Sequence, residues 1–199
     1  MKCFNKEQIV RNYRQLFLKH GTGPIVGQWS EEGQKFRFSK LCQIDNLTRK
    51  RVLEIGCGLG DLYPFLQGLF DEVTYVGIDI VPELIEYAAH VYPDAKFYCL
   101  DLLEDEFIGD FDYVLISGVF NNEIDNATEY LYQLISSAFK LCRKGMGFNF
   151  TSTYVSRYDQ GMAYHDPMAV FKFCLENLSS KITLSHHYER CDVAIFVYR

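Results

Sequence analysis

The feature that most constrains the fold is the alternation of short apolar runs with amphipathic segments that begins near residue 51. Apolar runs typical of buried strands occur at 52–55, 73–79, 96–99, 111–116 and 145–151. Segments with helical spacing occur at 62–69, 82–91 and 127–141. Short strands that alternate with helices indicate a parallel sheet with helices on both faces. The sequence therefore predicts a Rossmann-like, doubly wound α/β fold.

The two ends of the chain differ from this pattern. Residues 5–19 and 31–44 are expected to form helices that precede the sheet. After a helix at 167–177, the strands 181–185 and 193–198 surround a polar turn with no helix between them, which predicts an antiparallel C-terminal hairpin. At about 150 residues per domain, the 199 residues indicate one domain, with an N-terminal helical cap (1–48) and a cofactor-binding core (49–199).

Composition excludes several classes of partner. The net charge is −6, from 26 acids and 20 bases, and an acidic surface repels nucleic acid. No apolar run is long enough for a membrane span, and the first residues lack the pattern of a signal peptide. The seven scattered cysteines contain no C-x-x-C pair, so we expect reduced thiols, no metal site and a cytoplasmic location. The sequence does not indicate an oligomeric state.

A glycine-rich loop follows the first strand of the predicted sheet. It reads Glu54-Ile55-Gly56-Cys57-Gly58-Leu59-Gly60-Asp61. Glycines let a ligand lie against bare peptide groups, and the following helix offers unpaired amides. The NAD fingerprint is G-x-G-x-x-G, whereas here the third glycine comes one residue early. The acids of the loop disfavour a pyrophosphate and favour a cationic ligand, so an NAD-dependent reductase fits poorly.

Two further acids follow the next strands. Asp79 closes the second strand, where a carboxylate can accept hydrogen bonds from both hydroxyls of a ribose. Asp101 follows the third strand, where it can accept a hydrogen bond from an adenine amino group. Leu102 and Leu103 are suited to pack on the adenine ring. The implied ligand is an adenosine whose far end is positively charged.

With these residues in place, the sequence resembles the class I methyltransferases that use S-adenosyl-L-methionine and release S-adenosyl-L-homocysteine. The matching stretches are VLEIGCGLGD (52–61), YVGIDI (75–80), CLDLLED (99–105), FDYVLISGVFN (111–121) and AIFVYR (194–199). The resemblance implies that Asp79 holds the ribose and Asp101 the adenine. It implies that Ser117 lines the methionine side with backbone groups. The other residues that we expect at the cofactor site are Glu54, Gly56, Cys57, Gly58, Gly60, Asp61, Ile80 and Leu102.

The first forty residues, with Trp29, Gln34 and Arg37, are similar to a little-characterised bacterial group of such enzymes that act on small molecules. One interpretation is a helix packed on the sheet. The other is a lid, with Arg37 binding a carboxylate of the substrate or cofactor. His165 and Tyr164, in the insert before the last helix, are the other catalytic candidates. His186 and His187 are expected to be solvated, Cys57 to fill space, and Asp112 to be structural.

The acceptor is expected to be a small molecule methylated on oxygen, nitrogen or carbon. Methyltransferases that act on exocyclic base amines or on glutamine carry an Asn/Asp-Pro-Pro-Tyr/Phe element after the fourth strand, whereas residues 117–122 read SGVFNN. Two alternatives stay open. One is another use of the same cofactor, such as cyclisation or aminopropyl transfer, and the other is a cofactor-binding scaffold without catalysis.

Overall fold

The computed structural model of the 199-residue chain describes residues 6–186 and 191–199. A seven-stranded sheet forms its centre, in the order β3-β2-β1-β4-β5-β7-β6. The strands are β1 (Arg51–Ile55), β2 (Thr74–Asp79), β3 (Lys96–Cys99), β4 (Phe111–Ile116), β5 (Cys142–Thr151), β6 (Lys181–Ser185) and β7 (Asp192–Tyr198). The helices are α1 (Lys6–His20), α2 (Glu31–Leu41), α3 (Leu62–Leu69), α4 (Pro82–Val91), α5 (Ala127–Phe139) and α6 (Pro167–Asn177). Short 3-10 turns are η1 (Pro24–Gly27), η2 (Cys42–Ile44) and η3 (Val119–Asn121).

The pairing of the strands confirms the predicted sheet. From β3 to β5 all neighbours run parallel, and β7 pairs antiparallel with both β5 and β6. The register of β5 with β7 runs from Gly145↔Tyr198 to Thr151↔Asp192. The last strand therefore lies inside the sheet, with β6 at its edge.

At the junction of α5 and β5 the structure differs from the prediction. The helix ends at Phe139 rather than at residue 141, and the strand begins at Cys142 rather than at residue 145. Cys142 pairs with Phe111 of β4. The guanidinium group of Arg199 donates hydrogen bonds to the carbonyl oxygens of Phe139 (2.7 Å) and Cys142 (3.1 Å). A residue at the far end of the chain thus stabilises this junction, which local periodicity does not reveal.

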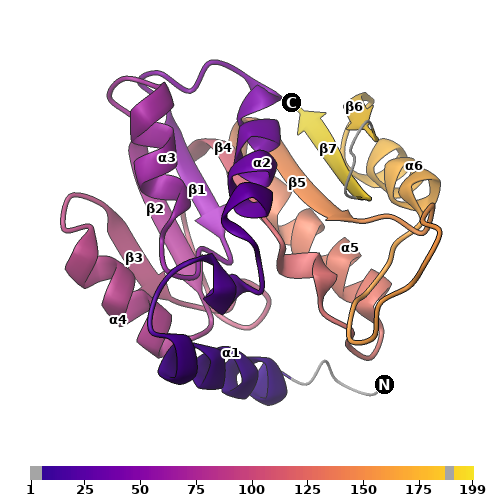
Figure 1. Cartoon of the computed structure of the whole chain (residues 1–199). Coiled ribbons are helices and arrows are strands. Elements are labelled where there is room, and N and C mark those ends of the chain that lie inside the picture. The colour runs from indigo at the N-terminus through magenta and orange to yellow at the C-terminus, as the bar shows by residue number, and fades with distance from the viewer. Residues whose placement is uncertain (1–5, 187–190) are drawn as a thin grey trace.

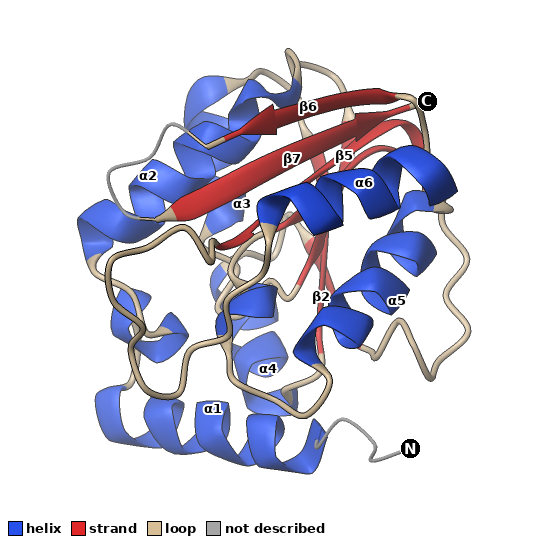
Figure 2. Cartoon of the chain, turned by 90° about the vertical axis from the view of Figure 1, so that its right-hand side faces the viewer, coloured by secondary structure: helices blue, strands red, loops and turns tan. Residues whose placement is uncertain are grey.

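Helices cover both faces of the sheet (Figure 2). On one face, α5 and α6 bring Leu131, Ile135 and Val170 against apolar strand residues. On the other face, α2 and α3 place Phe38 and Leu66 in a second buried cluster. Strands buried on both faces need apolar residues throughout, which explains the near-continuous apolar runs in the sequence.

The N-terminal segment covers one end of the sheet. Helix α1 lies across the end of the molecule toward which β1 points (Figure 1). It is joined to α4 by the ion pair Arg14 Nε–Glu83 Oε1 (2.5 Å) and by the edge-to-face contact of Phe17 with Tyr87. Val26 of turn η1 is buried beneath helix α1. The segment therefore packs over the carboxyl ends of the parallel strands.

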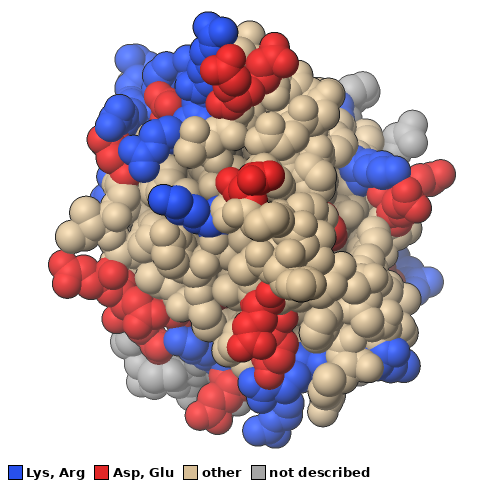
Figure 3. All heavy atoms as spheres, turned by 90° about the vertical axis from the view of Figure 1, so that its left-hand side faces the viewer, with Lys and Arg blue, Asp and Glu red and all other residues tan. Residues whose placement is uncertain are grey.

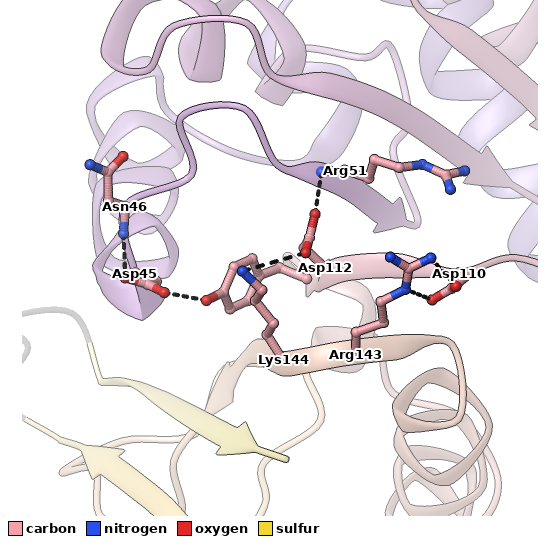
Figure 4. A network of polar contacts seen from close by, with 8 residues as sticks. Asp45, Asn46, Arg51, Asp110, Asp112, Arg143 and Lys144 are labelled. Carbon is pink, nitrogen blue, oxygen red and sulfur yellow. Dashed lines mark hydrogen bonds and ion pairs between the residues drawn. The ribbon is translucent and has the colours of Figure 1, made fainter.

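A polar network holds the amino ends of β1 and β4 at the opposite end of the sheet (Figure 4). Asp112 accepts a hydrogen bond from the backbone amide of Arg51 (2.9 Å) and lies 3.6 Å from Lys144 Nζ. Asp45 accepts a hydrogen bond from the hydroxyl of Tyr113. Asp112 therefore has the structural role predicted for it.

The surface combines both signs of charge. Figure 3 shows acidic side chains beside basic ones on one face, mostly toward its rim, with some of each sign nearer the centre. In the part of the chain that the structure describes, no helix is long and apolar enough to cross a membrane. Within the same residues, no group of three His, Cys, Asp or Glu side chains is placed to hold a metal ion.

Candidate cofactor site

A cavity lies at the carboxyl ends of β1, β2 and β4, and residues of α1 and η1 complete its lining. The sheet continues from β1 to β2 on one side and to β4 on the other, so the strand order reverses here. Open α/β sheets bind ligands in the crevice at such a point. Both the loop after β1 and the loop after β4 line this cavity.

The loop after β1 turns sharply beside the cavity. Gly56 and Gly58 line it with φ angles of +74° and +52°, in the left-handed region that favours glycine. Cys57 is buried between them and also lines the cavity. Gly60 has a φ of +79°, but a Cβ atom there would meet the ring of Phe97, and Gly60 does not line the cavity. The third glycine therefore lets the loop pack against the ring of Phe97 in β3, while the first two line the cavity.

Four carboxyl groups line the cavity, those of Glu54, Asp61, Asp79 and Asp101. Glu54 is 2% exposed and accepts a hydrogen bond from the hydroxyl of Tyr75. Burial raises the pKa of Glu54 well above its usual range, against the lowering effect of that hydrogen bond. None of the described residues that line the cavity is a Lys, Arg or His. The electrostatics of this site favour a positively charged ligand.

Two backbone amides orient Asp79, the last residue of β2. Its Oδ2 accepts a hydrogen bond from the amide of Gly58 (2.8 Å), and its Oδ1 accepts one from the amide of Val81 (2.9 Å). Burial raises the pKa of Asp79, and these backbone hydrogen bonds oppose that shift. A carboxylate has about four lone-pair positions, so it can still accept hydrogen bonds from a ligand. Ile80 lines the cavity beside it.

Contacts with the N-terminal segment engage the other two acids. Asp101, beside Leu102 in the cavity wall, lies 2.9 Å from Lys6 Nζ of α1 through Oδ2. Asp61 accepts a hydrogen bond at Oδ2 from the side-chain amide of Gln34 in α2 (3.0 Å). Each N-terminal helix is thus joined to a loop that lines the cavity.

Side-chain amides fix the loop that follows β4. Asn149 of β5 accepts a hydrogen bond from the backbone amide of Gly118 (2.8 Å), and its Nδ2 lies 3.5 Å from Ser117 Oγ. Asn121 in turn accepts a hydrogen bond from the amide of Thr151 (3.2 Å). The two asparagines therefore extend the contact between β4 and β5 beyond the last paired residues of these strands, Ile116 and Phe148. They also hold Ser117 at the cavity wall.

Sequence reasoning missed three polar residues of the cavity, which are Tyr13, Asn122 and Tyr130. Tyr13, expected only as part of the apolar face of a helix, lines the cavity and accepts a hydrogen bond from Asn122 Nδ2 (2.9 Å). Tyr130 of α5 lines it too, and burial raises the pKa of both tyrosines. Helical spacing marks Tyr13 as inward-facing but does not say what it meets.

The three cap residues named in the sequence analysis, Trp29, Gln34 and Arg37, do not share one position relative to the cavity. Trp29 and Gln34 line the cavity, whereas Arg37 does not. The Cζ atom of Arg37 lies 3.7 Å from the centre of the Trp29 ring, and Arg37 Nη2 lies 2.6 Å from Asp192 Oδ2. Arg37 is therefore engaged within the protein, behind the indole.

His165 and Tyr164 lie outside the cavity lining. His165 is 1% exposed, and its Nε2 lies 3.0 Å from the carbonyl oxygen of Phe120. Burial lowers the pKa of His165. The hydroxyl of Tyr164 accepts a hydrogen bond from the amide of Asp159 (2.8 Å). His187 lies outside the described residues.

Comparison with known proteins agrees with this fold and site. Residues 53–145 match the family described as a methyltransferase domain. Rv1506c of Mycobacterium tuberculosis, named as an inferred methyltransferase, is 29% identical over 155 residues, which are 73% of this chain and 91% of that protein. A malonyl-[acyl-carrier protein] O-methyltransferase of Acetivibrio thermocellus is 30% identical over 101 residues, 49% of this chain and 36% of that protein.

Solved structures show the same fold. The magnesium protoporphyrin IX methyltransferase of Synechocystis PCC 6803, with bound S-adenosylhomocysteine, superimposes with a TM-score of 0.66 at 17% identity, covering 98% of this chain and 100% of that chain. A Rossmann-like sheet with a reversed last strand, and a glycine loop at its switch point, define the class of protein. The chain has the fold of the class I S-adenosylmethionine-dependent methyltransferases, and its residues 53–145 match the methyltransferase domain.

Proposed function

We propose that this protein transfers the methyl group of S-adenosylmethionine to a small-molecule acceptor, on oxygen, nitrogen or carbon. The observation that carries the proposal is a cavity with four carboxyl groups and, among its described lining residues, no basic side chain. The sulfonium and ammonium groups of this cofactor are positive, and its hydroxyl and amino groups donate hydrogen bonds. The residues present therefore fit the cofactor. When bound, it supplies a methyl group activated for in-line displacement.

The assignments follow the order of the strands. Asp79 accepts hydrogen bonds from the ribose hydroxyls, because Gly58 and Val81 already orient its carboxylate toward the site. Asp101 accepts a hydrogen bond from the adenine amino group, and Ile80 and Leu102 pack on the ring. The methionine part is surrounded by Glu54, Gly56, Cys57, Gly58, Asp61 and the backbone of Ser117.

The site binds the cofactor, orients the acceptor and excludes water. An in-line transfer from an activated cofactor gains most from holding the acceptor in place in a dry cavity. Tyr13 and Trp29 close the cavity from the cap. A general base is needed only where the acceptor is protonated at the working pH. We assign no proton transfer to His165 or Tyr164, since both lie outside the lining.

A small acceptor is part of the same proposal. The cap forms part of the cavity wall, so the acceptor binds in a pocket that the cap partly lines. The net charge of −6 disfavours a nucleic acid. The thiols of Cys42, Cys142 and Cys174 are free and buried, which supports placing the protein in the reducing cytoplasm.

The test is a calorimetric titration of the protein with S-adenosylhomocysteine, with NADH as the control ligand. We expect binding of the first and no heat from the second. Turnover with a panel of small acceptors then identifies the reaction by its product. Methylthioadenosine in place of S-adenosylhomocysteine would assign cyclisation or aminopropyl transfer. Binding without turnover of any acceptor would favour a scaffold.

A further inference from the structure

We propose that Trp29 forms the wall of the cavity on the acceptor side, and that the buried pair of Arg37 and Asp192 positions this wall. Trp29 then limits the size of the group that fits beside the transferable methyl. The proposal rests on the proposed function, because it places an acceptor relative to the cofactor in the same cavity.

The order of the strands gives the direction of the cofactor. Asp101 follows β3, Asp79 ends β2, Glu54 lies in β1, and Ser117 follows β4. In the sheet these strands are neighbours in the order β3-β2-β1-β4. An adenine at the first acid and a ribose at the second direct the rest of the cofactor toward β4. The sulfonium group therefore lies at the β1 and β4 end of the cavity.

The indole of Trp29 occupies that end. A Cβ atom at Gly118, which directly follows Ser117, would lie 2.6 Å from Trp29 Cζ2, and one at Gly27 would lie 2.8 Å from Trp29 Cδ1. Gly118 also has a φ of +73°, which favours glycine. The indole is thus packed against two positions where a side chain does not fit. A larger group on the sulfonium or acceptor would have to displace it.

Arg37 and Asp192 hold the indole from behind. The guanidinium of Arg37 stacks on the ring at 3.7 Å and pairs with Asp192 at 2.6 Å, and the two side chains are 10% and 1% exposed. Asp192 begins β7, opposite Thr151 at the end of β5. A buried ion pair recovers its desolvation cost only with good geometry, and a cation over an indole adds further attraction. The sheet therefore determines where the wall stands, and Arg37 acts through Trp29 as a positioning residue.

The neighbours of Trp29 indicate the class of acceptor. Asn122 donates a hydrogen bond to Tyr13 (2.9 Å) and accepts one from Gln28 (3.3 Å), so neutral polar groups are available at this end. No basic side chain occurs among the described residues of the lining. The subsite therefore suits a small acceptor held by hydrogen bonds to neutral groups rather than by a pair with a basic side chain.

The wall can be tested before the acceptor is known. The full chain is titrated with S-adenosylmethionine and with the analogue that carries a benzyl group in place of the transferable methyl. A close-packed wall discriminates by about tenfold or more against additional carbon atoms, so we expect the wild type to bind the benzyl analogue at least that much more weakly. Trp29→Ala should bring the two affinities close together, and Trp29→Phe should give an intermediate ratio.

Leu102→Ala is the matched control, because Leu102 lines the adenine end of the same cavity. It should weaken both probes by the same factor and leave their ratio unchanged. If Trp29→Ala and Trp29→Phe retain the wild-type ratio, the wall assignment is overturned while the cofactor assignment stands. If the wild type binds neither probe, the proposed function and the wall assignment fail together.

The role of Arg37 has its own readout. Trp29 is the only tryptophan of the sequence, so tryptophan emission reports the surroundings of this one indole. Arg37→Met should shift the emission toward that of a solvated indole and reduce discrimination against the benzyl analogue. Arg37→Lys keeps a cation near the ring. Its emission and its discrimination against the benzyl analogue should both lie between those of Arg37→Met and those of the wild type. An unchanged emission and ratio in Arg37→Met would refute the positioning role.

Discussion

The backbone amide of Gly58 donates a hydrogen bond of 2.8 Å to the carboxylate of Asp79. It joins the glycine loop after β1 to the end of β2, so two segments that both line the cavity form one unit. The carboxylate of Asp79 is thereby held in place by the same loop that brings bare peptide groups to the cavity. A change at Asp79 should therefore affect affinity both directly and through the position of the glycine loop.

Asp79→Ala is expected to weaken the binding of S-adenosylhomocysteine by about 1–3 kcal/mol, the scale of a hydrogen bond to a charged group. Calorimetry measures the loss. Asp112→Ala is the matched control, because Asp112 lies at the amino end of β4 and bonds to the Arg51 amide there. It should reduce the free energy of unfolding and leave the affinity unchanged. Equal affinity of Asp79→Ala and the wild type would disprove the ribose assignment.

The unfolding free energy should depend on pH through Glu54. Burial raises its pKa in the folded protein, so its contribution to stability is fully present below its unfolded pKa of about 4.3. That contribution is lost as the pH rises through the raised folded pKa. The glutamine in Glu54→Gln cannot ionise. The unfolding free energy of this variant, relative to that of the wild type, should therefore increase as the pH rises from about 4. Urea unfolding at a series of pH values checks this, and parallel curves would contradict it.

His165→Gln is expected to change stability and not cofactor affinity. Burial lowers the pKa of His165, so its contribution to stability is present above the unfolded pKa of about 6.5 and is lost as the pH falls through the lower folded pKa. Above neutral pH the variant should lose about 1–3 kcal/mol, since the groups that contact the imidazole lose their partner. Unfolding and calorimetry measure the two effects. Normal stability with lost methyl transfer would instead assign the residue to catalysis.

Arg37 and Asp192 should behave as a coupled pair. Removing one partner of a buried ion pair typically costs about 3–5 kcal/mol, whereas an apolar replacement of both is often neutral. We expect Arg37→Met alone to be more destabilising than Arg37→Met combined with Asp192→Leu, as measured by denaturant unfolding. The control is the exposed pair Arg49–Glu72, whose side chains are 73% and 69% exposed. A double-mutant cycle on this pair should give a coupling free energy of about 0–1 kcal/mol. Additive effects at Arg37 and Asp192 would contradict the coupling.

Much of the core followed from local pattern. The apolar runs and the glycine loop predicted the order of strands and helices from Arg51 onward, because a buried parallel strand needs apolar residues on both faces. The sequence did not predict that α5 ends at Phe139, because Arg199, sixty residues away, bonds to its last carbonyl. The glycines also looked alike in sequence, yet Gly60 packs on Phe97 while Gly56 and Gly58 face the cavity.

The sequence by itself determined the acidic set of the site. Glu54 and Asp79 belong to β1 and β2, and Asp101 comes two residues after the end of β3. The carboxyl ends of parallel strands necessarily meet at one edge of the sheet. Only the tertiary structure decided which cap residues meet them. Helical spacing shows that Tyr13 faces inward, but where α1 and α2 dock depends on contacts such as Lys6 with Asp101 and Arg37 with Asp192. These contacts join residues far apart in the chain, so they form only when the whole sheet is assembled.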